Sequence, residues 1–199
     1  MFYPHPIKPK KPSAKGKGEA DNPSGKGSLR IRPQTQKLTH LSLLCALALA
    51  ISGVEMLIPP LPMLPPGAKP GFSNIVTMYA AGSLGIVPAL GIALIKGIFA
   101  GVTRGFTAFL MSTCGGILST LVMGCLLHIE KRPFSLIGVG IAGALAHNAA
   151  QLGVAAVLTS SAVVAYAPFL LLFSLITGTV TGLILRAVLP ALNKISQHC

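Results

Sequence analysis

One stretch, residues 134–158 (FSLIGVGIAGALAHNAAQLGVAAVL), contains no Asp, Glu, Lys or Arg over 25 residues. A helix of that length crosses the hydrocarbon core of a bilayer. His147, Asn148 and Gln151 lie in its middle, and at about 100° per residue they share one side of the helix. Polar groups at that depth must be satisfied inside the protein, either by a ligand or by hydrogen bonds between helices. Three of them within five residues favour a binding site.

The distribution of charge predicts a membrane protein with a basic tail. Only 10% of the residues are charged, against about 25% in soluble domains. Nine of the 16 Lys and Arg residues fall within the first 37 residues: Lys8, Lys10, Lys11, Lys15, Lys17, Lys26, Arg30, Arg32 and Lys37. We therefore expect a disordered cytoplasmic tail over residues 1–36 and an all-α transmembrane domain over residues 37–199. The tail's charges do not alternate with aromatic residues, so we expect no nucleic-acid partner.

The apolar segments predict six transmembrane helices, over residues 38–58, 72–83, 85–103, 106–128, 134–158 and 165–189. A break at Gly82–Gly85 decides between five and six. With six helices, Lys131, Arg132, Arg186 and Lys194 all face the cytoplasm, as the positive-inside rule prefers. Both termini are then cytoplasmic.

The second predicted helix is too short to cross a bilayer alone, and interrupted helices of this kind often border substrate sites. The six prolines within residues 58–70 predict a semi-rigid lid before it. Two charges in the apolar segments have open interpretations. Glu55 is either a solvated interfacial acid or a partner for a cation such as Lys69. Lys96, in the middle of a span, either reaches an interface or points at an anionic group.

The sequence offers no catalytic set. Prenyl-diphosphate chemistry uses aspartate clusters to hold magnesium, and the only Asp in the chain is Asp21. A nucleotide-binding loop is also absent from the sequence, and no cysteine pair has metal-site spacing. We therefore expect no enzymatic activity, no cofactor and no metal site.

Three segments together resemble the bacterial Gx transporter family, also labelled heptaprenyl diphosphate synthase component I. They are PGAKPGFSNIVTMYAAGSLG (Pro66 to Gly85), FLMSTCGGILSTLVMGCLL (Phe109 to Leu127) and FSLIGVGIAGALAHNAAQLGVAA, and the likeness covers about residues 38–189. This family looks related to the substrate-binding S components of energy-coupling factor (ECF) vitamin transporters. Pro70 and Phe72-Ser73 depart from the expected pattern.

The resemblance implies an S-component-like bundle in the bacterial inner membrane that captures a vitamin, flavin or isoprenoid-related molecule from the outer side. A transmembrane coupling subunit with ATPases would supply the energy, and Ala46 and Ala50 would contact that subunit. The implied substrate-binding residues are Lys69, Phe72, Asn74, His147, Asn148 and Gln151. Two other functions stay open: a non-catalytic membrane subunit of a flavin or quinone redox complex, and an adaptor that acts through the basic tail.

Overall fold

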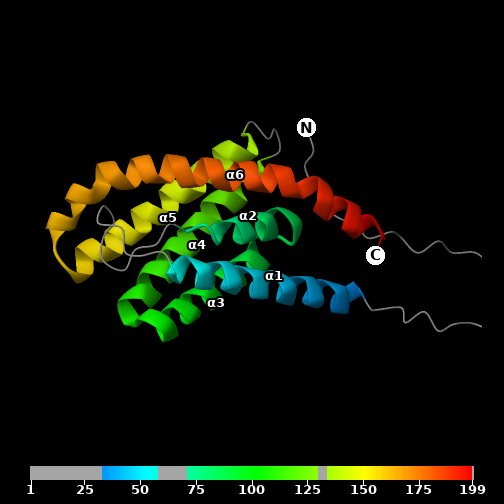
Figure 1. Cartoon of the computed structure of the whole chain (residues 1–199), viewed down its shortest axis with the longest axis horizontal. Helices are drawn as coiled ribbons and strands as arrows, with labels where there is room; N and C mark the ends of the chain where they lie inside the picture. Colours follow the sequence, from blue (N-terminus) through cyan, green and yellow to red (C-terminus); the bar gives the residue numbers. More distant parts are fainter. Residues whose placement is uncertain (1–32, 58–70, 130–133, 199) are drawn as a thin grey trace, which may run out of the picture.

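The structure, a computed structural model, describes residues 33–57, 71–129 and 134–198, and this part of the chain is all-helical. Most of the basic tail and the proline-rich segment 58–70 lie outside the described residues. The elements are α1 (Pro33–Met56), α2 (Asn74–Ser83), α3 (Ile86–Arg104), α4 (Phe106–His128), α5 (Leu136–Leu158), the short 3-10 helix η1 (Ser161–Tyr166) and α6 (Ala167–His198) (Figure 1). The first helix thus begins at Pro33, five residues before the predicted span.

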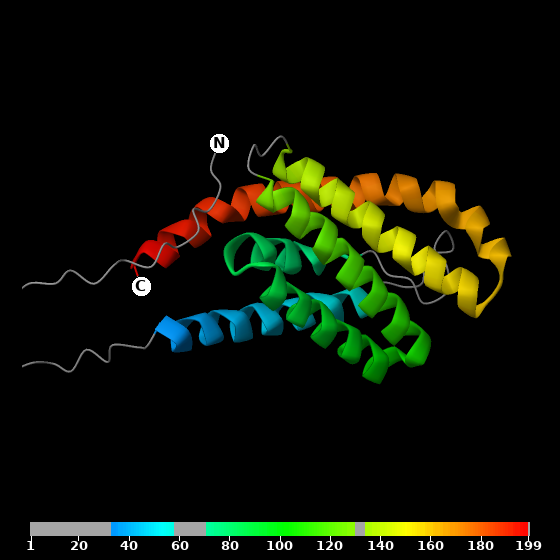
Figure 2. The same ribbon diagram turned by 180° about the vertical axis from the view of Figure 1, so that it is seen from behind.

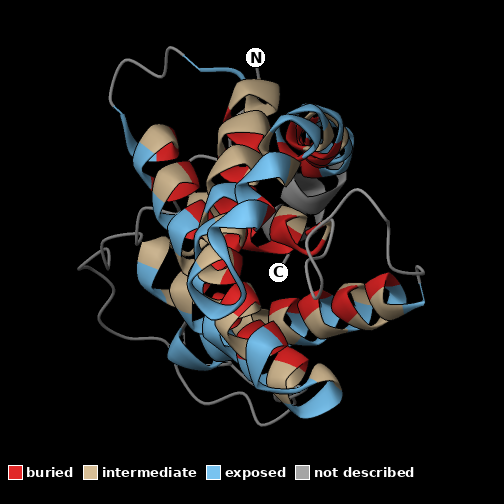
Figure 3. Cartoon of the chain, turned by 90° about the vertical axis from the view of Figure 1, so that its left-hand side faces the viewer, coloured by how far each residue is buried: buried red, intermediate tan, exposed pale blue. Residues whose placement is uncertain are grey.

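Five helical segments are long and apolar enough to cross a membrane: Gln34–Met56, Ile86–Arg104, Phe106–His128, Leu136–Leu158 and Ser161–Pro190. Many large apolar side chains of these helices are exposed, whereas buried residues gather on the inward faces (Figure 3). Val102 and Val157, for example, are 83% and 86% exposed, while Thr77 and Ser119 are fully buried. Apolar residues outside and polar residues inside are the arrangement that a lipid environment requires. The chain is therefore a helical, multi-pass membrane protein.

The short helix α2 is the exception to this pattern. It has 10 residues, which make about 15 Å of helix, too short to cross a bilayer. Of the six predicted transmembrane helices, five are therefore long and apolar enough to cross a membrane. Two glycines with positive φ bound it, Gly71 (78°) and Gly85 (103°), and the predicted break before α3 is thus confirmed. Seven of its ten residues are buried. The start of this short helix lies inside the bundle, where Ser73 and Asn74 contact the polar groups of Glu55 and Lys96.

The direction of each helix follows from its contacts. The ring of Tyr79 in α2 lies 6.1 Å from that of His40 in α1, whereas Ser73, before α2, contacts Glu55 near the end of α1. Helix α2 therefore runs antiparallel to α1, and α3 returns in the direction of α1. The start of α1 and the end of α6 lie at the same end of the bundle, as the two opposite views show (Figures 1 and 2).

Glycines allow the closest helix contacts. A Cβ at Gly140 in α5 would lie 2.5 Å from the carbonyl oxygen of Gly178 in α6, and one at Gly182 would lie 2.5 Å from the Cα of Ile137. Small residues spaced by four permit such backbone approach in membranes. Gly97 and Gly101 of α3 pack against α4 in the same way, since a Cβ at Gly101 would lie 2.9 Å from the Cβ of Phe109. Helices α3 to α6 thus form a tightly packed series, whereas α1 packs only against α2 and α3 among the described helices.

The helix directions predict which residues share a side of the membrane. In a cysteine-free variant, Ser83→Cys is expected to react with a membrane-impermeant maleimide from the same side as Arg186→Cys. Thr103→Cys, at the end of α3, is expected to react only from the opposite side. Labelling in right-side-out and inverted vesicles measures this. Reaction of Ser83→Cys from the side of Thr103 would contradict the direction assigned to α2.

Candidate functional site

The site begins where α2 starts. The backbone N–H of Ser73 donates a hydrogen bond to Oε1 of Glu55, with a nitrogen–oxygen distance of 3.2 Å. A carboxylate is favoured there because the first N–H groups of a helix lack intrahelical partners and carry partial positive charge. Glu55 is 5% exposed, so it is not the solvated interfacial acid that its position near the end of a span suggested. The only acid in the described residues therefore lies inside the bundle.

Lys96 of α3 approaches the same end of α2. Its Nζ donates to Oδ1 of Asn74 at 2.9 Å, and the lysine is 5% exposed. Glu55 acts electrostatically on both Lys96 and Arg104. A buried ammonium is tolerated only with a hydrogen-bond acceptor and a nearby counter-charge, and this lysine has both. Lys96 thus points into the bundle rather than towards an interface, which settles the orientation that the sequence left open.

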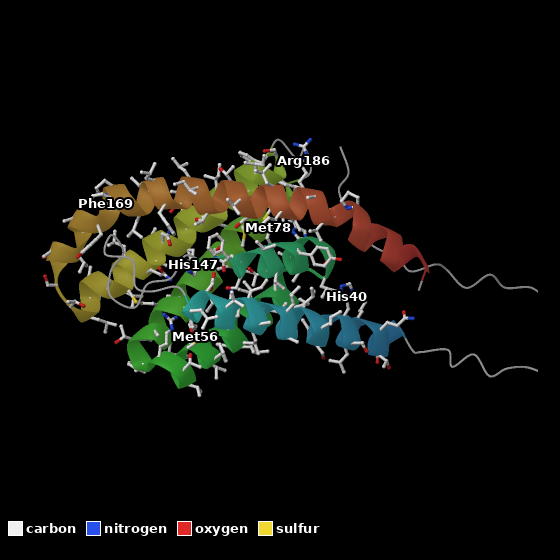
Figure 4. The ribbon with its side chains drawn as sticks, viewed as in Figure 1. His40, Met56, Met78, His147, Phe169 and Arg186 are labelled. Carbon is white, nitrogen blue, oxygen red and sulfur yellow. The ribbon has the colours of Figure 1, made fainter. Side chains whose placement is uncertain are left out.

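His147 and Gln151 come from one face of α5. Nε2 of Gln151 lies 2.9 Å from Nε2 of His147, so when the amide donates, the imidazole accepts and is neutral. The ring is held between two glycines: a Cβ at Gly71 would lie 3.1 Å from its Cδ2, and one at Gly115 of α4 would lie 2.8 Å from its Nδ1. Along the long axis His147 lies level with Met56, nearer Phe169 than the His40–Arg186 end (Figure 4).

These groups surround a polar cavity of about 20 Å³, room for about one water molecule. Its lining consists of Ser52, Glu55, Gly71, Ser73, Lys96, Phe99, Ala100, Arg104, Ser112, His147 and Gln151. Oε1 of Gln151 is buried and has no hydrogen-bond partner among the described residues. A buried polar atom without a partner costs free energy in a low-dielectric interior, so it marks a place where a further group would be stabilised.

Asn148 is separated from the cavity. Its Nδ2 donates to the hydroxyl of Ser174 at 2.7 Å, across the contact between α5 and α6, and it does not line the cavity. Asn148 is one residue, or about 100°, beyond His147 on the helix, and that rotation turns it towards α6. Of the two roles that the sequence allows for the polar groups of this helix, ligand binding and interhelical hydrogen bonding, Asn148 has the second.

The other predicted site residues are placed as follows. Asn74 is buried and bonds Lys96 beside the cavity. Phe72 is half-buried and is not part of the lining, although its neighbours Gly71 and Ser73 are. Lys69 lies outside the described residues. Ala46 and Ala50 are both exposed on α1, and the described residues contain no group of three His, Cys, Asp or Glu side chains that could hold a metal.

Sequence reasoning left Glu55, Lys96 and Arg104 out of the predicted site. A signal was present, because the apolar spans contain a single acid and few cations, and opposite charges in lipid tend to pair. The spacing of Lys96, Ala100 and Arg104 by four residues also places them near one face of α3. What the sequence could not supply was the packing of that face against α1 and the start of α2.

The histidine clamp gives a test of the site's geometry. Gly115→Ala is expected to displace the imidazole of His147, because the added Cβ would lie 2.8 Å from both Cε1 and Nδ1. Overpacking of this kind costs about 1–3 kcal/mol. Gly91→Ala, on α3, serves as the control, because a Cβ added there would meet nothing within 4 Å. Unfolding in SDS followed by circular dichroism compares the two, and equal free energies of unfolding would contradict the clamp.

Comparison with known proteins places the chain in a family. A family model described as heptaprenyl diphosphate synthase component I matches residues 44–188, which is 145 of the 199 residues (188 − 44 + 1). The match runs from α1 into α6 and includes every cavity residue. No curated protein and no solved structure matches the chain. The chain belongs to the heptaprenyl diphosphate synthase component I family.

Proposed function

We propose that this protein is the substrate-binding subunit of an importer of the ECF type, and that it takes up a small, vitamin-like molecule. The observation that carries this proposal is the polar cavity between α1, the start of α2, α3, α4 and α5, where Oε1 of Gln151 has no partner among the described residues. Convergent polar groups in an otherwise apolar bundle are typical of small-molecule sites. Interrupted helices with one end beside the site, as α2 has at its start, are typical of membrane transporters.

The cavity must enlarge to accept such a molecule. Its volume of about 20 Å³ is far below the roughly 300–1,000 Å³ of small-molecule pockets. Helix α1 supplies Ser52 and Glu55 to one wall and packs only against α2 and α3 among the described helices. We infer that the ligand enters as α1 moves outward, because this wall has the fewest neighbours to displace.

The cavity's position supports entry from outside the cell. His147, which lines the cavity, lies level with Met56, away from the end of the bundle that carries His40 and Arg186 (Figure 4). The basic tail comes directly before α1 in the sequence, and α1 starts at the His40 end of the bundle. Basic segments next to spans are retained in the cytoplasm. With both termini cytoplasmic, the cavity lies in the outer half of an inner membrane. Helix α2 crosses only part of the bilayer and returns the chain towards the cytoplasmic side between α1 and α3.

Energy would come from another subunit. Ala46 and Ala50 are exposed, one turn apart, on α1, which packs against only two of the other described helices. Small residues at that spacing let a second helix approach closely. We therefore assign this face of α1 to a transmembrane coupling subunit that works with ATPases.

The family's description names a synthase component, but we propose that the chain itself catalyses no prenyl transfer. Asp21 is its only aspartate, so an aspartate cluster for magnesium and pyrophosphate cannot form within one chain. The cavity holds a single carboxylate, that of Glu55, and this group already accepts a hydrogen bond from Ser73. A role in binding suits these residues better than a role in metal-assisted chemistry.

The test is a comparison of what the full chain retains when it is purified from its own membranes. Mass spectrometry is expected to find both a small molecule and a coupling subunit with ATPases. Ala46→Leu with Ala50→Leu is expected to lose the protein partners and to keep the small molecule. Ala149→Leu, an exposed alanine on α5, is the matched control and should keep both.

Two outcomes would contradict the proposal. Retention of redox subunits without a small molecule would favour the alternative, a non-catalytic subunit of a flavin or quinone complex. Loss of every partner on deletion of residues 1–32, with no small molecule bound before or after, would favour an adaptor that acts through the tail.

A further inference from the structure

We propose that the molecule bound in this cavity is an anion, a carboxylate or phosphate, and that its negative group replaces the carboxylate of Glu55 at the start of α2. This inference rests on the proposed binding function and adds the chemical class of the ligand. Three features of the cavity support it: the charges of its lining, the present occupant of the helix end and the unpartnered amide oxygen.

The first feature is the net positive charge of the side chains that line the cavity. The lining contains two cationic side chains, Lys96 and Arg104, and one carboxylate, Glu55. With a neutral His147, their formal sum is +1. An excess positive charge in a low-dielectric, membrane-embedded site favours an anionic ligand and disfavours a cationic one. When Glu55 leaves the cavity the sum rises to +2, so the preference for an anionic ligand becomes stronger.

The position for that negative group is already visible. The N–H of Ser73 points at Oε1 of Glu55, and α2, which begins one residue later, has ten residues. The N–H groups of Asn74, Ile75 and Val76 already donate to backbone carbonyls. The donor that this end offers to an anion is therefore the Ser73 N–H, together with the partial positive charge of the helix end. Glu55 comes from α1, the wall proposed to move. Its withdrawal with α1 would leave both the Ser73 N–H and the Lys96 ammonium facing the enlarged cavity.

On the other side of the cavity, Gln151 requires a hydrogen-bond donor on the ligand. Gln151 is 2% exposed, and its Oε1 has no partner in the described part of the chain. This oxygen can only accept, so the ligand group that meets it must carry an N–H or O–H. The ligand therefore combines an anionic group for Ser73 and Lys96 with a polar donor for Gln151.

Matched pairs of small molecules test the class. The probes are nicotinate with nicotinamide, pantothenate with pantothenol, and pyridoxine 5′-phosphate with pyridoxine, added to the full chain in nanodiscs. Binding is measured by calorimetry, and the compound released by the purified protein is identified by mass spectrometry. We expect an anionic released compound and binding of at least one anionic probe without its neutral partner, and the carboxylate and phosphate pairs distinguish the two anion types.

Two variants bracket the expected effect. Lys96→Met should weaken binding of the anionic probe by about tenfold or more, because a hydrogen bond to a charged group is lost. Glu55→Gln should strengthen it by about tenfold, since the competing carboxylate is removed from the helix end. Arg186→Met removes an exposed cation at the other end of the bundle and should leave binding unchanged.

The outcomes separate this inference from the function beneath it. A neutral or cationic released compound, or equal binding of both members of a pair, overturns the anion inference and leaves the importer proposal standing. Weaker anion binding by Glu55→Gln overturns the replacement of Glu55. If nothing is released and no probe binds, both proposals fail.

Discussion

Asn74→Leu is expected to destabilise the folded protein by about 1.5–3 kcal/mol, which is the usual value of a hydrogen bond to a charged group. The substitution keeps the size of the side chain but removes Oδ1, which accepts from Nζ of Lys96 at 2.9 Å. Lys96 is 5% exposed, so water does not replace the lost acceptor freely. The free energy of unfolding, measured by SDS titration with circular dichroism, gives the size of the loss.

A second substitution separates stability from binding. Lys96→Met in the Asn74→Leu background removes the buried charge itself, and an apolar replacement of a buried polar pair is often close to neutral. We expect the double variant to recover most of the lost stability and to bind the anionic probe about tenfold or more weakly than the wild type does. If the double variant is as unstable as Asn74→Leu alone, the contact between the two side chains is not the cause.

Gly140→Ala is expected to weaken the contact between α5 and α6. The added Cβ would lie 2.5 Å from the carbonyl oxygen of Gly178 and 3.1 Å from the backbone nitrogen of Gly182. Backbone atoms cannot rotate away as a side chain can, so the two helices must separate. We expect a loss of about 1–3 kcal/mol in the free energy of unfolding.

Gly153→Ala is the matched control for this effect, because it lies on the same helix and a Cβ there meets nothing within 4 Å. It should be neutral or slightly stabilising, since alanine favours helix more than glycine does. Both variants are measured in the same detergent. Equal effects at the two positions would show that helix propensity, rather than close packing, governs this pair of helices.

Much of the fold could be predicted because the bilayer restricts it strongly. Apolar stretches bounded by glycine and proline gave the ends of α2 to α5 to within two residues, and the break before Gly85 was correct. The number of full crossings was not, because the prediction counted α2, whose ten residues reach about half of the hydrocarbon core. The prediction of six spans came from the positive-inside rule, which tells on which side of the membrane each loop lies. A helix that crosses only part of the bilayer can also return the chain to the first side, so the rule does not distinguish it from a full span.

The site was predicted in part. Helical periodicity places His147 and Gln151 together, and they do line one cavity. Periodicity gives the angle between residues on one helix but not the helix that each face meets. For that reason Asn148, only one residue from His147, bonds Ser174 across the contact with α6 instead.

The charged part of the site depended on contacts between distant segments. Glu55 and Lys96 are 41 positions apart (96 − 55), and each has a solvated or interfacial interpretation when considered alone. Only the packing of α1 and α3 around the start of α2 places them in one cavity. Pairing the single acid of the apolar spans with their mid-span lysine would have been the better prediction.

The central claim, that this cavity binds a small molecule, is tested most directly by native mass spectrometry of the full chain released from nanodiscs. Gln151→Met keeps the length of the side chain and removes its amide, which carries the unpartnered Oε1 and the donor to His147. We predict that the wild-type protein carries an added mass of vitamin size and that Gln151→Met does not. An identical spectrum for the two proteins, with or without an added mass, would contradict the claim.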